Sequence, residues 1–329
     1  MKKKVQMTIL ALCTAVTMTA CGGNADTAEV QETTAAEESV EADAQAEAEA
    51  EEQAQAEEQA KIEEAGKCYE AGRRSLYGLD GAKIDLEDAH TNFTKSQELG
   101  NTDANFYLGI LAHFYGYPKR DYEQARAYYE QSGDNPYAQI GLGFLYYNGD
   151  GVEQDMEKGR ESFQSAADQG IIEGYYGLAM VAENEGDYET ALEHYTKVAQ
   201  EGTEQGYIAA AMGGIGYIYA FNDGAEKDGA KAVEWYTKAA DLGHTDAMNS
   251  LGAMYAYGNG VEQDGTKAVE WYTKAADVGE TSAMIGLGSM YAYGKGVEQD
   301  SEKAMEWYTK AADLGDTEAG EHLEQLQGQ

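Results

Sequence analysis

The chain has 329 residues, with 60 Asp and Glu against 23 Lys and Arg, which gives a formal net charge of −37. A charge of this size and sign excludes nucleic acid and an anionic membrane surface as the bound partner, because both are bound by clustered Lys and Arg. The sequence contains only 2 Pro, so proline-rich and collagen-like chains are also excluded.

The N-terminus carries a predicted targeting segment. Three lysines at 2–4 precede a mostly apolar run at 5–18, which is too short and too polar for a permanent membrane-spanning helix. The run MTAC, which ends at Cys21, and the Gly-Gly after it resemble a bacterial lipoprotein signal, in which small residues precede a lipidated Cys. We predict that 1–20 is a signal peptide and that lipid on Cys21 anchors the protein to the extracytoplasmic side of the cell membrane. The alternative is an ordinary secretory signal followed by a chance Cys.

An acidic segment follows the proposed lipid site. Residues 24–65 include 15 acidic residues and one basic residue, a local charge of −14, and they show no apolar stripe. Ala, Glu and Gln favour helix, but like charges four residues apart oppose it. We therefore predict that 21–65 is a disordered, solvated tether, at most transiently helical, that holds the next domain away from the membrane.

The rest of the chain, 66–329, repeats itself. Segments 246–281 and 282–317 align over 36 residues with 26 identities, and this period is typical of a helical solenoid. One aromatic position recurs along the whole domain, at Phe93, Tyr129, Phe163, Tyr195, Tyr236, Tyr272 and Tyr308. We predict an all-α, α/α superhelical solenoid of about seven helix pairs, most regular in 246–317. Residues 66–88 are expected to form a degenerate first pair, and 317–327 a capping helix.

Each regular unit is expected to contain two helices. In the first, Ala247, Leu251 and Tyr255 share one face, and Gly252 beside them would let a neighbouring backbone come close. The second helix has an amphipathic stripe of aromatic residues and Ala. The glycines of the connector at 258–264 permit the positive φ of a tight turn, and Asp264 is placed to cap the second helix.

The motifs L-G-x-M-Y, G-x-G-V and W-Y-x-K-A-A resemble those of the Sel1-like repeat family, a branch of the tetratricopeptide superfamily. The match is strong over 246–317, good over 207–245 and partial over 137–170, whereas 187–202 looks more like a plain tetratricopeptide helix. The resemblance implies a right-handed superhelix whose inner face binds proteins or peptides, as in adaptors. Some cysteine-rich members are said to bind or hydrolyse β-lactams, but they carry a Cys pair in each repeat, which this chain lacks.

The sequence predicts no enzyme, with no catalytic residue, no cofactor and no metal site. The five His are scattered among the repeats without zinc-site spacing, and no nucleophile elbow is present. The G-x-G connectors lack the preceding strand and following Lys-Ser/Thr of a phosphate loop. Cys68 is expected to be a small buried residue.

Four tyrosines are the candidate ligand-binding residues. Tyr257 and Tyr293 each lie two residues beyond a core-facing tyrosine, so they cannot share its face while the helix continues. They either pack over the connector that follows or, extended by Tyr217 and Tyr147, form a line of exposed tyrosines that contacts a peptide.

The leading hypothesis is a lipid-anchored, non-catalytic scaffold or adaptor that binds an unidentified protein or peptide. Residues 66–329 carry 45 acidic and 19 basic residues, a charge of −26, which favours a basic or neutral partner. The alternatives are a cell-wall or glycan-binding lipoprotein and, third, a hydrolase of wall peptides or β-lactams.

Overall fold

The computed structural model describes residues 27–221 and 227–327. The chain divides into two units, Met1–Glu64 and Ala65–Gln329. The boundary lies one residue before the position at which the sequence predicts the repeat domain to begin.

Helix α2 (Thr27–Tyr77) covers most of the segment expected to be a disordered tether, so the prediction of disorder differs from the structure over 27–64. The side chains of residues 43–63 are all exposed, which lets solvent screen the closely spaced carboxylates. Amide–carboxylate hydrogen bonds of 3.3 Å join Gln45 to Glu49 and Gln53 to Glu57. The helix propensity of Ala, Glu and Gln, assisted by these pairs, outweighs the repulsion between like charges.

The second unit consists of helices joined by short turns. The helical elements after α2 are η1 (Leu79–Gly81), α3 (Leu86–Glu98), α4 (Asp103–Ile110), the π-helical turn η2 (Leu111–Tyr115), α5 (Tyr122–Gln131), α6 (Pro136–Asn148), α7 (Met156–Asp168), α8 (Gly174–Asn184), α9 (Tyr188–Glu201), α10 (Gln205–Phe221), α11 (Gly229–Asp241), α12 (Thr245–Tyr257), α13 (Gly265–Asp277), α14 (Thr281–Tyr293), α15 (Ser301–Asp313) and α16 (Thr317–Gln327). From α4 onward, each even-numbered helix up to α14 is the first helix of a pair and the next odd-numbered helix is the second.

The first pair differs from the expectation for 66–88. That segment contains the end of α2, the short turn η1 and only the first three residues of α3, so the first pair is α2 with α3 and extends beyond residue 88. Ser96 Oγ on α3 donates a 2.8 Å hydrogen bond to the carbonyl of Ala65, and the ring of Phe93 lies against Gly72. Cys68 is buried in this part of α2, as expected.

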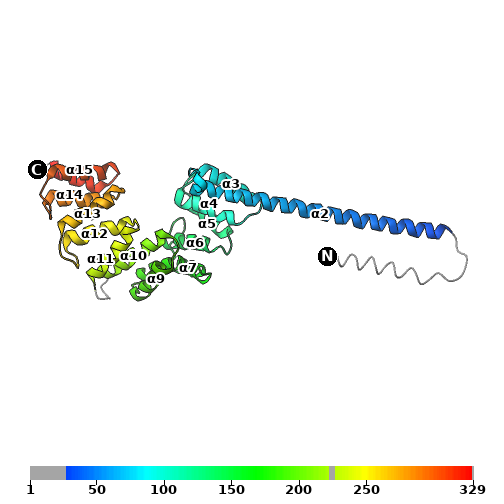
Figure 1. Cartoon of the computed structure of the whole chain (residues 1–329), viewed down its shortest axis with the longest axis horizontal. Coiled ribbons are helices and arrows are strands. Elements are labelled where there is room, and N and C mark those ends of the chain that lie inside the picture. The colour runs from blue at the N-terminus through cyan, green and yellow to red at the C-terminus, as the bar shows by residue number, and fades with distance from the viewer. Residues whose placement is uncertain (1–26, 222–226, 328–329) are drawn as a thin grey trace. The chain divides into compact units, whose positions relative to one another are not determined.

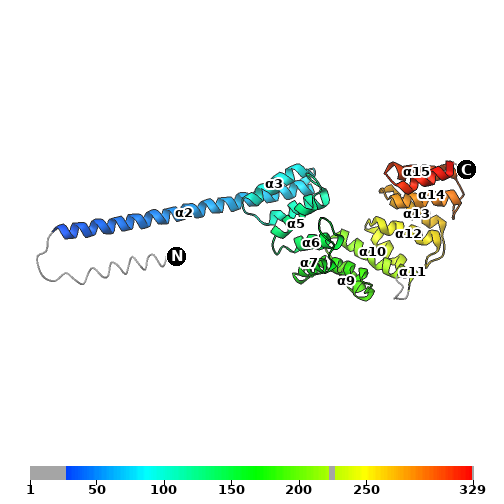
Figure 2. The same cartoon turned by 180° about the vertical axis from the view of Figure 1, so that it is seen from behind.

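Successive pairs stack in chain order, as both views show (Figure 1, Figure 2). The first helices of neighbouring pairs contact one another, α4 with α6, α6 with α8, α10 with α12 and α12 with α14. We call these helices the first-helix layer. The prediction of an all-α solenoid of stacked helix pairs is confirmed.

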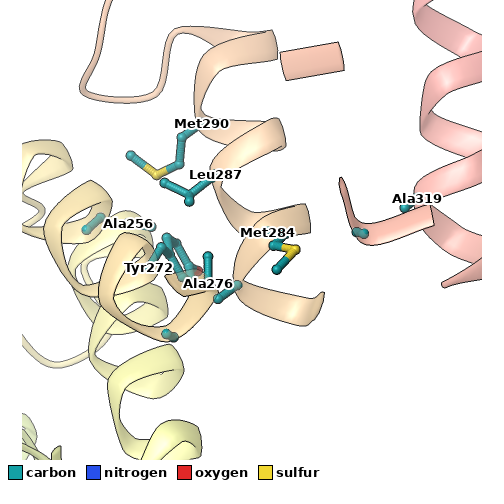
Figure 3. Packing of buried hydrophobic residues seen from close by; sticks show 11 residues of the cluster. Ala256, Tyr272, Ala276, Met284, Leu287, Met290 and Ala319 are labelled. Carbon is teal, nitrogen blue, oxygen red and sulfur yellow. The ribbon is translucent and has the colours of Figure 1, made fainter. Parts of the chain in front are cut away.

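The recurring aromatic residues are the centres of the core. All seven are buried, with exposed fractions between 0% and 4%. Tyr272 on α13 points toward Leu287 and Met290 of the next pair (Figure 3). A Cβ on Gly252 would lie 2.5 Å from Tyr272 Cδ1, and one on Gly286 would lie 2.8 Å from its Cζ. Gly252 therefore makes room for an aromatic ring, not for the neighbouring backbone that the sequence suggested.

The connectors and caps follow the predicted local chemistry. Gly258 and Gly260 have φ of 70° and 72°, and Asp264 Oδ1 accepts a 3.0 Å hydrogen bond from the backbone N–H of Lys267. This hydrogen bond, with the nearby Lys267 ammonium, lowers the pKa of Asp264. At the C-terminal end, Leu323 of α16 packs against the cluster around Tyr308, as a capping helix should.

Candidate functional site

The first-helix layer contains a hollow of about 490 Å³. Its lining comes mainly from α8, α10 and α12, with two residues from α9 and single residues from α6 and α11. We call it the central hollow. Six tyrosines line it, namely Tyr147, Tyr176, Tyr188, Tyr195, Tyr217 and Tyr236.

Small residues on α10 create the space. Ala210, Gly213, Gly214 and Tyr217 follow the i, i+3, i+4, i+7 spacing of one helix face, and three of the four have no side chain beyond Cβ. A Cβ on Gly214 would lie 2.6 Å from Tyr195 Cε2, so the ring of Tyr195 already fills the position beside this helix. Tyr217 is 46% exposed at the edge of the hollow.

Two carboxyl groups contribute to the lining. Tyr195 Oη donates a 2.8 Å hydrogen bond to Glu183 Oε2. Burial raises the pKa of Glu183 above its ordinary value, and the hydrogen bond from Tyr195 opposes this shift. Asp246 lies in the first turn of α12 and is exposed, so its charge faces solvent and the hollow together.

Tyr176, Tyr236 and His244 of the hollow are neutral near pH 7. Burial raises the pKa of Tyr176 and of Tyr236 to about 12 in each case, and it lowers the pKa of His244. The Nδ1 of His244 accepts a 3.2 Å hydrogen bond from the backbone N–H of Ala247 and caps α12. Neutral His244 therefore carries its proton on Nε2. Since the lining includes no Lys or Arg among the described residues, the hollow has an excess of negative charge.

The four candidate tyrosines fall into two groups. Tyr147 and Tyr217 line the central hollow, whereas Tyr257 and Tyr293 lie outside it, at the ends of α12 and α14. Tyr257 and Tyr293 are 56% and 63% exposed, and Lys295 Nζ lies 5.0 Å and 5.7 Å from their ring centroids. The structure therefore brings the four together in two pairs and not in one line.

Apart from its tyrosines, the ionisable residues of the hollow are Glu183, Asp246 and His244, and none of them was a candidate site residue in the sequence. The repeat pattern contained a signal for Glu183. In the regular repeats, the residue five positions after the recurring Leu is a buried alanine, Ala256 or Ala292. In the repeat with Leu178, the same position holds Glu183. Tyr147 occupies the same position one repeat earlier. In both of these repeats, the large or charged residue in place of the buried alanine lines the hollow.

The three tryptophans occupy the other layer. Trp235, Trp271 and Trp307 lie half-buried on second helices, with a Lys Nζ 4.1, 3.9 and 3.9 Å from the respective ring centroids. They do not line the central hollow.

Two absences concern only residues 27–221 and 227–327. Within these ranges, no helix combines the length and apolar character needed to cross a bilayer. The same part of the chain has no group of three or more His, Cys, Asp or Glu side chains arranged to hold a metal ion. Cys21, the predicted lipid attachment site, and the predicted signal peptide lie outside the described residues.

Comparison with known proteins identifies the repeat. The Sel1 repeat profile matches six consecutive segments, 102–135, 136–171, 173–203, 209–244, 245–280 and 281–316. No curated protein matches the chain.

Two solved structures are similar over most of the chain. A Sel1 repeat protein from Oxalobacter formigenes is 31% identical, with 77% of this chain and 99% of that one covered and a TM-score of 0.58. The protein c5321, described as a protective antigen of uropathogenic Escherichia coli with an SLR fold, is also 31% identical, with 83% of this chain covered and a TM-score of 0.56. The match spans 58% of the length of c5321. The six consecutive repeats and these two likenesses agree, and the chain belongs to the Sel1 repeat family.

Proposed function

We propose that the protein is a lipid-anchored, non-catalytic scaffold that binds a protein or peptide through its first-helix layer, on the extracytoplasmic side of a bacterial membrane. The observation that carries the binding role is the central hollow, a concave site of about 490 Å³ with six tyrosines. Tyrosines in a concave site supply large, rigid contact area with a polar tip, which is typical of residues that dominate protein interfaces.

The chemistry of the hollow favours binding over catalysis. Tyr176, Tyr236 and His244 are held neutral, and Glu183 accepts a hydrogen bond from the hydroxyl of Tyr195. A general base or nucleophile needs a group poised to exchange a proton at the reacting atom, together with a partner that orients it. The tyrosine hydroxyl donates to the carboxyl here, so the pair resembles a fixed hydrogen bond in a binding surface.

The binding role is tested by chemical crosslinking in cells with three forms of the protein. Wild type is compared with a Tyr147→Ala, Tyr217→Ala variant of the hollow and with a Glu234→Gln, Glu270→Gln variant of the second helices. We expect a defined crosslinked species with wild type and with the second-helix variant, and a reduced yield with the hollow variant. Equal yields from all three forms would contradict a role for the hollow.

The anchor is tested separately by replacing Cys21 with Ala. Lipid attached at Cys21 supplies enough buried methylene groups for stable membrane association, so its loss is expected to move the protein into the soluble fraction. Unchanged membrane retention of Cys21→Ala would show that this residue does not carry the anchor.

A further inference from the structure

The central hollow has a chemistry that selects among ligands. Its charged lining groups are Glu183 and Asp246, which reach it from α8 and α12 on opposite sides of α10. The repeat domain around it carries 45 acidic and 19 basic residues. A concave site with one sign of charge concentrates ligands of the opposite sign.

The tyrosine rings of the hollow also favour a positively charged ligand. The π-face of an aromatic ring attracts an ammonium or guanidinium group within about 6 Å of the ring centroid. Elsewhere in the chain, tyrosine rings make this contact with lysines of the same chain. Lys197 Nζ lies 3.9 Å from the ring centroid of Tyr175, and Lys267 Nζ lies 4.9 Å from that of Tyr255.

The hollow lacks such an internal cation. In the part of the chain that the structure describes, no Lys or Arg lies over the ring of any of its six tyrosines. The tyrosines at the ends of α12 and α14 differ, because Lys295 lies over both. Among the described residues, the six tyrosine rings beside Glu183 and Asp246 are therefore without a cation of the chain's own.

We propose that the central hollow binds a lysine or arginine side chain of an extended peptide segment. The cationic head lies among Tyr147, Tyr176 and Tyr217, three of the lining tyrosines that are not fully buried, and it is paired with the carboxylates of Glu183 and Asp246. The hydrogen bond from Tyr195 fixes Glu183 in place, so less side-chain entropy is lost when the cation is bound.

The flanking peptide has polar partners at the same site. The Nε2–H of His244 can donate to a carbonyl, and the oxygen of the Ser250 hydroxyl, which hydrogen-bonds Tyr236, can accept from a peptide N–H. The volume of about 490 Å³ lies within the range of small-ligand sites and accommodates the side chain with adjacent backbone. This inference rests on the proposed binding function and adds the chemical class of the ligand.

The test uses the purified full chain, labelled with ¹³C on the tyrosine rings, and four acetylated and amidated tripeptides. The central residue is Lys, Arg, Gln or Glu between two alanines. Ring signals of the hollow are assigned from Tyr176→Phe and Tyr217→Phe, and peptide binding is followed by their shifts at low salt. We expect the Lys and Arg peptides to shift these signals with saturation, and the Gln and Glu peptides to leave them unchanged.

Two conservative variants test the role of the carboxylates. Glu183→Gln and Asp246→Asn keep the shape and polarity of each side chain, so each is expected to fold and to weaken binding of the Arg peptide by about three- to tenfold. Glu270→Gln on α13 removes one negative charge from the second-helix layer and is expected to leave the affinity unchanged at moderate salt.

Several results would overturn the inference. Equal shifts with the Gln or Glu peptide, unchanged affinity in both carboxylate variants, or no shift with the Lys and Arg peptides would each exclude a cation site. Binding of the Gln peptide in the hollow would leave the scaffold function intact and remove only the preference for charge. A crosslinking yield that is the same for wild type and for the Tyr147→Ala, Tyr217→Ala variant would contradict the scaffold function itself.

Discussion

Replacement of Gly252 by Ala tests whether the aromatic cores depend on glycine. The new Cβ would lie 2.5 Å from Cδ1 and 2.7 Å from Cε1 of Tyr272, whereas ordinary contacts begin at 3.4 Å. The ring would have to move by about 1 Å. Gly286 of α14 lies against the same ring, so the ring is confined between neighbouring pairs.

The expected magnitude follows from two opposing effects. Inserting one carbon into a well-packed core costs about 1–3 kcal/mol, and replacing Gly by Ala inside a helix returns about 1 kcal/mol. The net effect is a loss of about 1 kcal/mol in the free energy of unfolding, or about 2–4 °C in Tm for a domain of this size.

Gly320→Ala is the matched control for this substitution. Gly320 lies inside helix α16, and a Cβ there would meet no atom within 4 Å. Only the helix propensity changes, so stability is expected to rise by about 0.5–1 kcal/mol. Both variants are compared with wild type by urea unfolding, followed by circular dichroism at 222 nm. If Gly252→Ala stabilises the protein as much as Gly320→Ala does, the confinement of Tyr272 is refuted.

Three further predictions concern pH, capping and binding. Burial lowers the pKa of His113 from 6.5 to about 4. Between these pH values the unfolded chain binds more protons than the native chain, so the free energy of unfolding falls as pH falls. His113→Gln should make the free energy of unfolding less dependent on pH in this range, and an unchanged pH dependence would contradict the burial of a neutral His113. Asp264→Ala should lower Tm more than Asp264→Asn, because Asn retains the capping oxygen; equal losses would exclude capping as the cause. A Tyr257→Ala, Tyr293→Ala variant should bind the crosslinked partner more weakly than wild type, and wild-type yield would exclude these tyrosines from the interface.

The repeat architecture could be predicted because each unit encodes its own packing. The aromatic positions from Phe93 to Tyr308 recur at nearly constant spacing, and every one is buried where the pattern placed it. Connector glycines and capping aspartates depend on local backbone chemistry, so they too could be predicted. The role of Gly252 was only partly predictable. A close approach could be expected from a glycine, but the group that approaches it is the ring of Tyr272 on the second helix of the same unit, which the helical spacing of one element does not reveal.

The acidic segment shows the limit of composition as a predictor. Its charge favoured disorder and its Ala, Glu and Gln favoured helix, and the two effects are similar in size. Hydrogen bonds such as the one from Gln53 to Glu57 stabilise the helix further, and residues 27–64 are helical.

The central hollow could not be predicted because it depends on how three repeats stack. Gly213 and Gly214 are ordinary helix residues until the neighbouring helices bring Glu183 and Asp246 to either side of them. Spacing within one helix placed Tyr257 away from the core-facing side but left open whether it packs over the connector or is exposed, and it is 56% exposed. Its separation from Tyr147 and Tyr217 could not be derived, because helical spacing says nothing about positions across repeats.

Site-specific photocrosslinking tests the central claim most directly. A benzoylphenylalanine in place of Tyr217 would place the reactive group at the central hollow, and one in place of Glu270 would place it on a second helix. The account predicts one defined crosslinked partner from position 217 in cells, lost when an excess of an arginine-containing peptide competes, and none from position 270. A partner captured equally well from position 270, or from neither position, would contradict binding through the first-helix layer.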